Sequence, residues 1–293
     1  MSFERRPGPG AGSVSGHRPG SRLGSLGTAG LILIALLIAG IWATWHLQLE
    51  LSQLSPGRGG WQLAADFFGR ALRPAWQFEG SFQGTGSASL PAQAVRAAGT
   101  TIIFAATSLS LALIGGLGLG FLSSFSLMRG RFLRAIVVAA RLLSNLVRSV
   151  HELIWAVFLL AAFGLGPLVA VIAIALPYAG TLAKIFAEMM DEAPDDAAGA
   201  LELTGASSVQ CFVFGILPRA LPDMTAYTFY RFECALRSSA VLGFFGFPTL
   251  GYYIAASFEN LYYGEVWTYL YVLLALILAV DWWSGRLRQE LLS

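Results

Sequence analysis

Apolar runs long enough to cross a bilayer as helices recur along the chain, and short polar segments separate them. A helix needs about 20 apolar residues to cross the hydrocarbon core of a membrane. Arg141 and Arg148 interrupt the third run, so a cytoplasmic or interfacial helix is an alternative for its first part. The pattern predicts an all-α integral membrane protein with six transmembrane helices, at about residues 31–45, 98–122, 136–164, 167–190, 219–245 and 265–284.

The first apolar run is predicted to be a retained span at residues 28–46. No small-residue cleavage pattern follows it, as a signal peptide would require, and Trp42 and Trp45 end it as interfacial anchors do. Residues 1–27 are rich in Gly, Pro, Ser and Arg, and this composition predicts a disordered cytoplasmic tail. By the positive-inside rule, four arginines of this tail place it in the cytoplasm: Arg5, Arg6, Arg18 and Arg22.

The next polar region, residues 47–96, is then external and contains one amphipathic pattern. Between Trp61 and Trp76, apolar residues recur at helical spacing, while Asp66, Arg70 and Arg73 are polar. This pattern predicts an amphipathic helix lying on the outer membrane surface.

The other five spans are predicted to form a core domain at residues 97–285, followed by a cytoplasmic C-terminal tail at residues 286–293. Arginines after the second and the last span agree with both chain ends being inside. Four arginines fall on the predicted outer side, so the charge bias is not uniform: Arg58, Arg70, Arg73 and Arg96.

Composition supports the membrane prediction and excludes several kinds of partner and site. The chain is 56% hydrophobic and 12% charged, against about 25% charged residues in soluble domains. A net charge of +2, scattered around membrane boundaries, argues against a nucleic-acid partner. The three histidines and two cysteines lack metal-ligand spacing, so no metal site or cofactor is expected in this chain.

A P-loop ATPase is also excluded by motif. The only lysine, Lys184, follows Ala183, so a phosphate-binding Gly-Lys-Ser/Thr loop cannot occur. Gly116 and Gly120 in the second span are interpreted as helix-packing positions, with a nucleotide loop as the alternative. No catalytic residues are predicted, and energy for uphill transport would come from a partner or an ion gradient.

Charges inside the apolar stretch TFYRFECALRSSAVLG, residues 228–243, give the strongest site signal. A charge near the bilayer centre costs at least about 2.5 kcal/mol, so it faces protein or a water-filled cavity. Glu233 and Arg237 are four residues apart in the favourable order, and we expect them to neutralise each other. Arg231 has no ionised partner on its own helix; Glu152 of the third span could pair with it, in competition with Arg148.

The predicted pathway set carries one excess positive charge, which suits an anion because guanidinium groups bind phosphoryl oxygens in bidentate fashion. The alternative is a set of interhelical ion pairs that fix the scaffold and never touch solute. The candidate residues of the translocation pathway or gate are Arg148, Glu152, Arg231, Glu233, Arg237 and Ser238.

Residues 191–218 between the fourth and fifth spans predict a cytoplasmic knuckle of two short helices. Gly205 is a natural stop for the first helix, Ser207 or Ser208 can cap the second, and Pro218 is expected to end it. The knuckle either lies against the membrane or docks to a cytoplasmic subunit.

The knuckle resembles the cytoplasmic loop of the permease subunits of bacterial ABC importers. That loop carries Glu-Ala-Ala, three residues, Gly, nine residues and Ile-x-Leu-Pro. Here Gly205 precedes Leu217 and Pro218 at the matching distance, and Ala200 falls within the Glu-Ala-Ala position. The resemblance assigns coupling to the ATPase to five residues: Ala200, Gly205, Ala206, Leu217 and Pro218.

The chain departs from that pattern at three positions: Gly199 stands for the glutamate, Leu201 for the second alanine and Gly215 for the isoleucine. Because glycine replaces that glutamate at position 199, the sequence does not establish the docking contact that the glutamate makes in the family. The stretches HELIWAVFLLAAFGLGP and LPRALPDMTAYTFYRFECALRSSAVLG resemble the third and fifth spans of phosphonate-type permeases, and the resemblance covers residues 95–285.

The resemblance implies an ABC type I importer permease fold in the bacterial cytoplasmic (inner) membrane. It implies a second permease, identical or a paralogue, two cytoplasmic ATPase subunits that hold ATP and Mg, and an external periplasmic solute-binding protein. The implied solutes are phosphonate, phosphate or phosphite. A permease for another small solute, a secondary transporter or channel, and a membrane-embedded enzyme are the alternatives.

Overall fold

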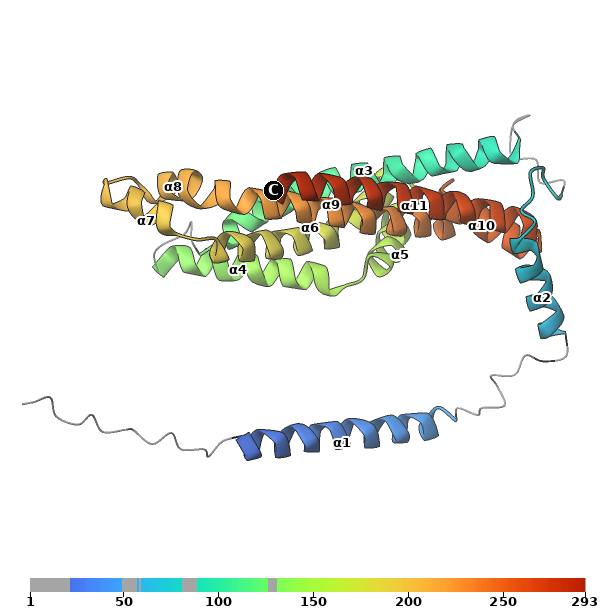
Figure 1. Ribbon diagram of the computed structural model, residues 1–293, viewed down its shortest axis with the longest axis horizontal. Helices are drawn as coiled ribbons and strands as arrows, with labels where there is room; N and C mark the ends of the chain where they lie inside the picture. The colour runs from blue at the N-terminus through green and yellow to red at the C-terminus, as the bar shows by residue number, and fades with distance from the viewer. Residues whose placement is uncertain (1–21, 49–56, 58, 81–88, 126–130, 293) are drawn as a thin grey trace, which may run out of the picture. The chain divides into compact units, whose positions relative to one another are not determined.

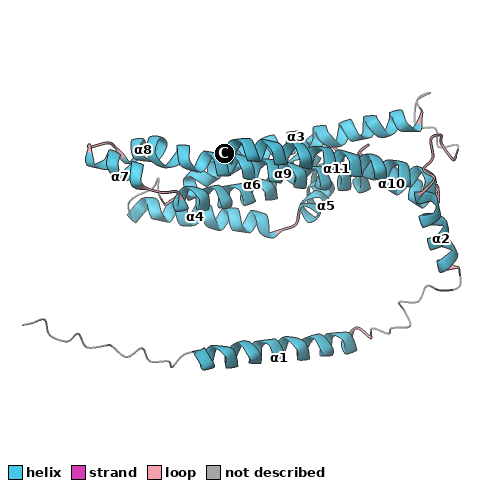
Figure 2. Ribbon diagram, viewed as in Figure 1, coloured by secondary structure: helices cyan, strands magenta, loops and turns pink. Residues whose placement is uncertain are grey.

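The computed structural model describes residues 22–48, 57, 59–80, 89–125 and 131–292 (Figure 1). Most of the predicted N-terminal tail lies outside these residues. The described ranges contain helices and turns and no strand, as the sequence predicts for an all-α protein (Figure 2). In chain order the α-helices are α1 (Arg22–His46), α2 (Gly60–Ala71), α3 (Leu90–Ser123), α4 (Arg131–Ser149), α5 (Glu152–Phe163), α6 (Pro167–Glu192), α7 (Asp196–Leu203), α8 (Ser208–Cys211), α9 (Leu217–Val241), α10 (Leu250–Glu259) and α11 (Tyr263–Leu292).

The chain divides into two compact units, residues 1–63 and residues 64–293. In the first unit, α1 covers the predicted first span, and its apolar side chains, such as Leu33 and Ile38, are exposed in the chain by itself. The second unit contains the helical core and all the residues of the site described below.

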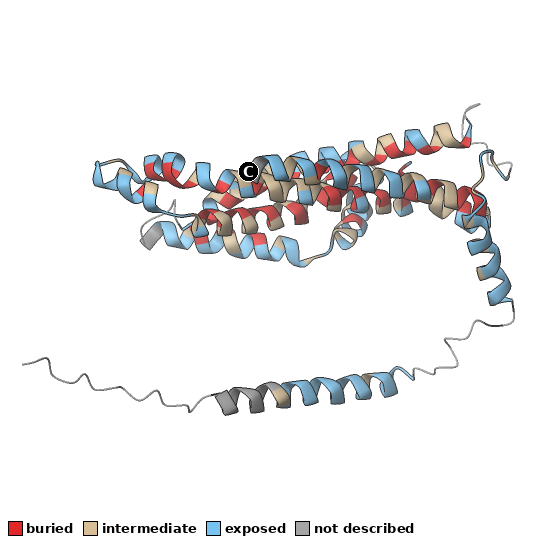
Figure 3. Ribbon diagram, in the orientation of Figure 1, coloured by how far each residue is buried: buried red, intermediate tan, exposed pale blue. Residues whose placement is uncertain are grey.

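The core of the second unit lies between α3, α6 and α9, whose facing sides are buried while their outer sides are exposed (Figure 3). Small residues permit the close approach of α3 and α6. A Cβ atom at Gly116 would meet the Leu182 Cβ at 2.6 Å, and one at Gly120 would meet the Phe186 Cβ at 3.3 Å. The packing interpretation of these two glycines is therefore confirmed.

Three helical segments of the described chain are long and apolar enough to cross a membrane: Leu90–Ser123, Pro167–Glu192 and Tyr263–Glu290. Two bent pairs raise this number to five if each pair is one span: Leu133–Ser149 with Glu152–Phe163, and Ser208–Phe245 with Leu250–Glu259. The apolar part of α1, Gly30–His46, is shorter. The predicted count of six is therefore not reproduced in full.

The predicted third span differs most from a straight helix, because α4 and α5 meet at a bend of 86°. His151 begins α5 as its N-cap, and its Nδ1 accepts a hydrogen bond from the Leu153 amide at 3.3 Å. The arginines that interrupt the apolar run, Arg141 and Arg148, both belong to α4. A first part that carries arginines and a second part that is apolar after Glu152 thus form two helices with different directions.

The predicted amphipathic helix is present as α2, and its C-terminal part packs on α11. Three side chains of α11 donate hydrogen bonds to backbone carbonyls: Trp267 Nε1 to Phe67 at 2.7 Å, Tyr271 Oη to Ala71 at 2.7 Å and Thr268 Oγ1 to Ala75 at 2.6 Å. The residues from Phe67 to Ala75 are therefore attached along the first turns of α11. Phe68 of α2 and Leu72, directly after α2, remain largely exposed, although the Phe68 ring lies 6.4 Å from the Trp267 ring.

Candidate functional site

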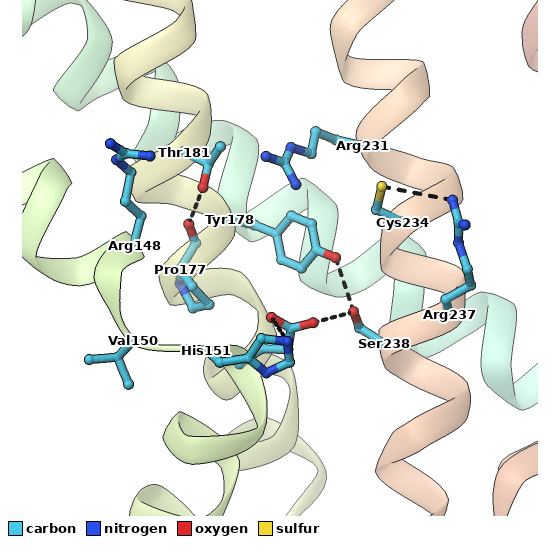
Figure 4. Close-up of a pocket in the computed structure, with 11 residues that line it drawn as sticks. Arg148, Val150, His151, Pro177, Tyr178, Thr181, Arg231, Cys234, Arg237 and Ser238 are labelled. Carbon is cyan, nitrogen blue, oxygen red and sulfur yellow. Dashed lines mark hydrogen bonds and ion pairs between the residues drawn. The ribbon is translucent and has the colours of Figure 1, made fainter. Parts of the chain in front are cut away.

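A cavity of about 340 Å³ lies between the α4–α5 bend, α6 and α9 (Figure 4). Five of the six predicted pathway residues line it: Arg148, Glu152, Arg231, Arg237 and Ser238. The other lining residues were not selected from the sequence: Val150, His151, Pro177, Tyr178, Thr181 and Cys234.

Two of the lining residues flank residues 150 and 151, where the chain bends between α4 and α5. Arg148 lies in the last turn of α4, and Glu152 is the first residue of α5. Gly180 lets α6 approach α4 closely, because a Cβ atom there would meet the Ser144 carbonyl oxygen at 2.7 Å. Two residues of α6, Pro177 and Tyr178, also line the cavity.

A directed chain of hydrogen bonds crosses the cavity from α6 through α9 to α5. Ser238 Oγ donates to Glu152 Oε1 at 2.8 Å and lies 3.0 Å from Tyr178 Oη. A serine hydroxyl has a single proton, so Tyr178 must donate to Ser238 when Ser238 donates to the carboxylate. Tyr178 and Ser238 thereby hold Glu152 in place, as the dashed lines around Ser238 show (Figure 4).

The arginines of the cavity keep most of their donor groups available. Arg231 Nε donates to Tyr227 Oη at 3.0 Å, and its guanidinium lies 5.3 Å from the Tyr178 ring centroid. Arg148 Nε donates to Asn145 Oδ1 at 3.0 Å, and Arg237 has a long 4.0 Å contact with Cys234 Sγ. None of the three forms a salt bridge within the described residues.

The electrostatic balance of the cavity favours an anion. Three guanidinium groups face one carboxylate there, so two positive charges are in excess when His151 is neutral. Each guanidinium can offer paired N–H groups to two oxygens of one tetrahedral anion. The arrangement can therefore attract and orient a small oxyanion, and its charge excess is one unit larger than the sequence indicated, since Glu233 lies outside the cavity.

The predicted pairing of Glu233 with Arg237 is wrong. Glu233 is buried, with 9% of its side chain exposed, and its Oε1 accepts a hydrogen bond from Arg288 Nη2 of α11 at 3.3 Å. Arg237 is exposed and contacts Cys234 instead. The sequence placed Arg288 in a C-terminal tail, whereas α11 continues as a helix to Leu292 and brings this residue beside α9. The expected competition between Arg148 and Arg231 for Glu152 is likewise replaced by the bond from Ser238.

The predicted two-helix knuckle is present as α7 and α8, with Gly205 between them. Gly205 has a φ of +86°, and its amide donates to the Glu202 carbonyl at 3.0 Å. The amide of Ala206 donates to the Leu201 carbonyl at 3.2 Å, which completes a Schellman motif. Ser207 caps α8 in a reciprocal capping box with Gln210, so both the predicted stop and the predicted cap are confirmed.

Pro218 does not end the second helix, contrary to the prediction. A π-helical turn, Phe212–Ile216, joins α8 to α9, and Pro218 lies in the first turn of α9. The amide of Leu217 bonds to the Phe212 carbonyl, five residues back. The wider turn relieves the clash of the proline ring with the preceding carbonyls, so the chain continues as a helix.

The knuckle presents an exposed surface that contains apolar side chains. Leu203 is 91% exposed and Phe214 is 70% exposed, while Ala200, Gly205 and Pro218 are also exposed. Ala206 and Leu217, the two other predicted coupling residues, are half-buried.

Close packing explains one departure from the family pattern at the knuckle. A Cβ atom at Gly215 would lie 2.7 Å from Ala198 Cα, so a residue without a side chain is needed where α7 crosses the π-helical turn. Isoleucine at this position would force α7 away from the turn.

Comparison with known proteins gives a family and a set of relatives. The family model described as binding-protein-dependent transport system inner membrane component matches residues 112–292. The putative phosphite transport system permease protein HtxE of Stutzerimonas stutzeri is 35% identical over 159 residues, which are 54% of this chain and 61% of that protein. The phosphite transport system permease protein PtxC of the same organism is 38% identical over 154 residues, or 52% of this chain and 55% of PtxC.

A third relative and a solved structure extend the comparison. The phosphate-import permease protein PhnE of Mycolicibacterium smegmatis is 30% identical over 157 residues, 54% of this chain and 30% of that protein. The chain thus spans little more than half the length of HtxE and PtxC. A chain of the inward-facing MetNI methionine ABC transporter superposes with a TM-score of 0.59 and 20% identity, covering 68% of this chain and 96% of that one. This likeness shows a shared fold.

Proposed function

The chain belongs to the family of binding-protein-dependent transport system inner membrane components, and we propose that it is the channel-forming permease subunit of an ATP-driven ABC importer. We further propose that it carries a small phosphorus oxyanion: a phosphonate, phosphite or phosphate. The relatives named for phosphite and phosphate transport support this substrate class. The structural observation that best supports an anionic substrate is the cavity in which three arginines face one glutamate.

In this proposal the cavity is part of the translocation pathway. Arg148, Arg231 and Arg237 provide guanidinium donors for the oxygens of the anion, while Glu152 and Ser238 provide an acceptor and a donor of fixed direction. Glu233 lies outside the cavity and acts through Arg288 as a structural residue.

The proposal includes partners that supply energy and solute. Two cytoplasmic ATPase subunits bind ATP and Mg, an external solute-binding protein delivers the anion, and a second permease, identical or a paralogue, completes the pathway in the bacterial inner membrane. The α7–α8 knuckle docks to an ATPase subunit through Leu203 and the residues around Gly205. Closure of the ATPase subunits moves the knuckle, and α9, which continues from it, carries the motion to the cavity.

Orientation follows from the same assignment. If the knuckle faces the cytoplasm, both termini are cytoplasmic, and α2 with the segment up to residue 80 lies outside. The exposed side chains of Phe68 and Leu72 then lie at the outer membrane surface.

The test is the ATPase activity of the reconstituted permease with its ATPase subunits and binding protein, with phosphate, phosphite and methylphosphonate offered in turn. We expect one of these anions, delivered by the binding protein, to stimulate hydrolysis, because solute delivery is coupled to ATPase closure in this proposal. Stimulation by an uncharged solute or a cation would contradict the substrate class. Full transport without any ATPase subunit would contradict the importer itself and favour a secondary transporter.

A further inference from the structure

The carboxylate of Glu152 is unexpected in a cavity whose other charges attract anions. Its side chain is 23% exposed, and it lies on the cavity wall with three arginines. A negative group next to an anion reduces affinity by direct repulsion, so binding strength alone does not explain a glutamate here.

We propose that Glu152 selects the proton-bearing form of the transported oxyanion. The carboxylate accepts a hydrogen bond from the P–OH group of a phosphonate or hydrogen phosphate, and it repels an anion without a proton, such as sulfate. This inference rests on the proposed function of the cavity as an oxyanion site, and it adds the rule by which the site distinguishes tetrahedral anions of similar size.

The hydrogen bonds around Glu152 leave one of its oxygens available. Oε1 accepts from Ser238, whereas Oε2 lies 3.6 Å from His151 Nε2, beyond hydrogen-bond length. Within the described part of the chain, Oε2 receives no hydrogen bond. An ionised carboxylate is an acceptor only, so the group that fills this position must donate a hydrogen bond to it.

Ser238 also fixes the direction in which Glu152 can act. Tyr178 donates its hydrogen bond to Ser238, and Ser238 donates its own to Glu152 Oε1. While the carboxylate is ionised, neither hydroxyl group therefore has a hydrogen left to donate to the solute. The arginines supply donors on other sides of the cavity. The site therefore combines several donors with one fixed acceptor, which matches an anion that carries several bare oxygens and one hydroxyl.

Phosphorus and sulfur oxyanions differ in protonation near neutral pH. The second ionisation of phosphorus oxyacids falls near neutrality, so a large fraction keeps one P–OH group. Sulfate has the same tetrahedral shape and no proton to donate. The titratable or charged groups that face Glu152 are His151 of α5, Arg148 of α4, Tyr178 of α6, and Arg231, Cys234 and Arg237 of α9.

The experiment measures binding to the purified full-length chain in lipid nanodiscs, without the binding protein. Thermal unfolding is followed against methylphosphonate or sulfate concentration at about pH 6 and about pH 8, on either side of a second ionisation. The readout is the ratio of the two apparent affinities. The ratio cancels any effect of pH that acts equally on the two anions.

For the wild-type chain we expect methylphosphonate to bind better than sulfate at the lower pH, and this preference to fall as the pH rises. Simple charge attraction predicts the opposite trend, because the methylphosphonate dianion is drawn more strongly to three arginines than the monoanion. Glu152→Gln should reduce the preference by about tenfold, since an amide also donates to sulfate. Glu188→Gln makes the same change on α6, where the side chain pairs with Lys184 at 3.3 Å outside the cavity, and should keep the preference.

Each outcome has a separate meaning. If neither anion stabilises the wild-type chain, the proposed oxyanion cavity is wrong. If both anions bind but the preference is absent, rises with pH or survives in Glu152→Gln, the cavity stands and the role of Glu152 is overturned. The pH trend of the wild-type chain gives a decision even if Glu152→Gln fails to fold.

Discussion

Arg231 is a charge in the middle of an apolar helix without a carboxylate partner among the described residues. Two tyrosine rings surround its guanidinium, at 5.3 Å for Tyr178 and 5.4 Å for Tyr227. Each cation–π contact supplies about 0.5–2 kcal/mol, so the two contacts together are of the same order as the cost of a charge at the bilayer centre, about 2.5 kcal/mol or more. Tyr178 and Tyr227 therefore help to hold this charge in the cavity without neutralising it.

Replacement of Arg231 by Gln should lower anion uptake about tenfold, because one charge-assisted bidentate contact is lost. Uptake by the reconstituted complex measures this effect, and the affinity of the separate binding protein should stay unchanged. Arg286→Gln is the matched control, since Arg286 stacks on Trp282 at 4.5 Å and does not line the cavity. Normal uptake by Arg231→Gln at normal expression would remove Arg231 from the pathway.

At the scale of elements, the knuckle depends on one backbone conformation. Gly205 has a left-handed φ of +86° and open space around the position of its missing Cβ atom. A side chain there would be unfavourable because of the backbone alone, and not because of a collision. Gly199 on α7 also has open space, but its backbone is helical. Substitutions at the two glycines therefore separate the effect of backbone conformation from the effect of side-chain volume.

Gly205→Val should disrupt the Schellman motif at a cost of about 1–2 kcal/mol, because a left-handed conformation is strained in a residue with a Cβ atom. Hydrogen exchange of the amides in residues 196–211, measured on the permease chain, should speed up in this variant. Gly199→Val should leave the exchange close to that of the wild type. In the assembled importer we also expect Gly205→Val to lose solute-stimulated ATPase activity, and stimulation that stayed intact would argue against the assigned docking element.

The bend between α4 and α5 is the element that creates the cavity. A straight third span would place Arg148 and Glu152 one helical turn apart on the same face, as an i, i+4 pair. The 86° bend separates them, so Arg148 bonds to Asn145 and Glu152 bonds to Ser238 of α9. Two residues that would neutralise each other in a helix thus remain available to a solute.

At the scale of the whole molecule, buried charge connects helices that are distant in sequence. Arg288 near the end of α11 pairs with Glu233 of α9, and Glu265 at the start of α11 accepts hydrogen bonds from the Glu79 amide at 2.6 Å and Ser257 Oγ at 3.0 Å. Both carboxylates are buried. These contacts hold the two ends of α11 to the helical core and to the segment that follows α2.

Arg288→Gln should lower the free energy of unfolding by more than Glu233→Gln, because the first change leaves a buried carboxylate without its counter-charge. We expect about 1–3 kcal/mol for Arg288→Gln, less than for a fully buried pair since the arginine is 32% exposed. Thermal unfolding of both variants and of the double variant in nanodiscs gives the comparison. Equal, additive losses would show that the pair does not interact.

Much of the architecture was predictable because it depends on composition and local patterns. Apolar runs determine which segments leave water, and glycine, serine and proline act through their own backbone preferences, as at Gly205 and Ser207. For this reason the membrane helices, the knuckle and most of the charged residues of the cavity could be found without a structure. Pro218 was misread because a π-helical turn depends on how α7 packs against residues 212–216.

By itself, the sequence determined the all-helical membrane class, the helix stop at Gly205, the cap at Ser207, and which charges lie in apolar surroundings. Tertiary structure decided which of these charges meet. Glu233 is closer in sequence to Arg237 but bonds to Arg288, and Glu152 bonds to Ser238 instead of an arginine. The physical reason is that pairing follows distance in space and burial, and helix bends and packing set both across segments that local sequence does not connect.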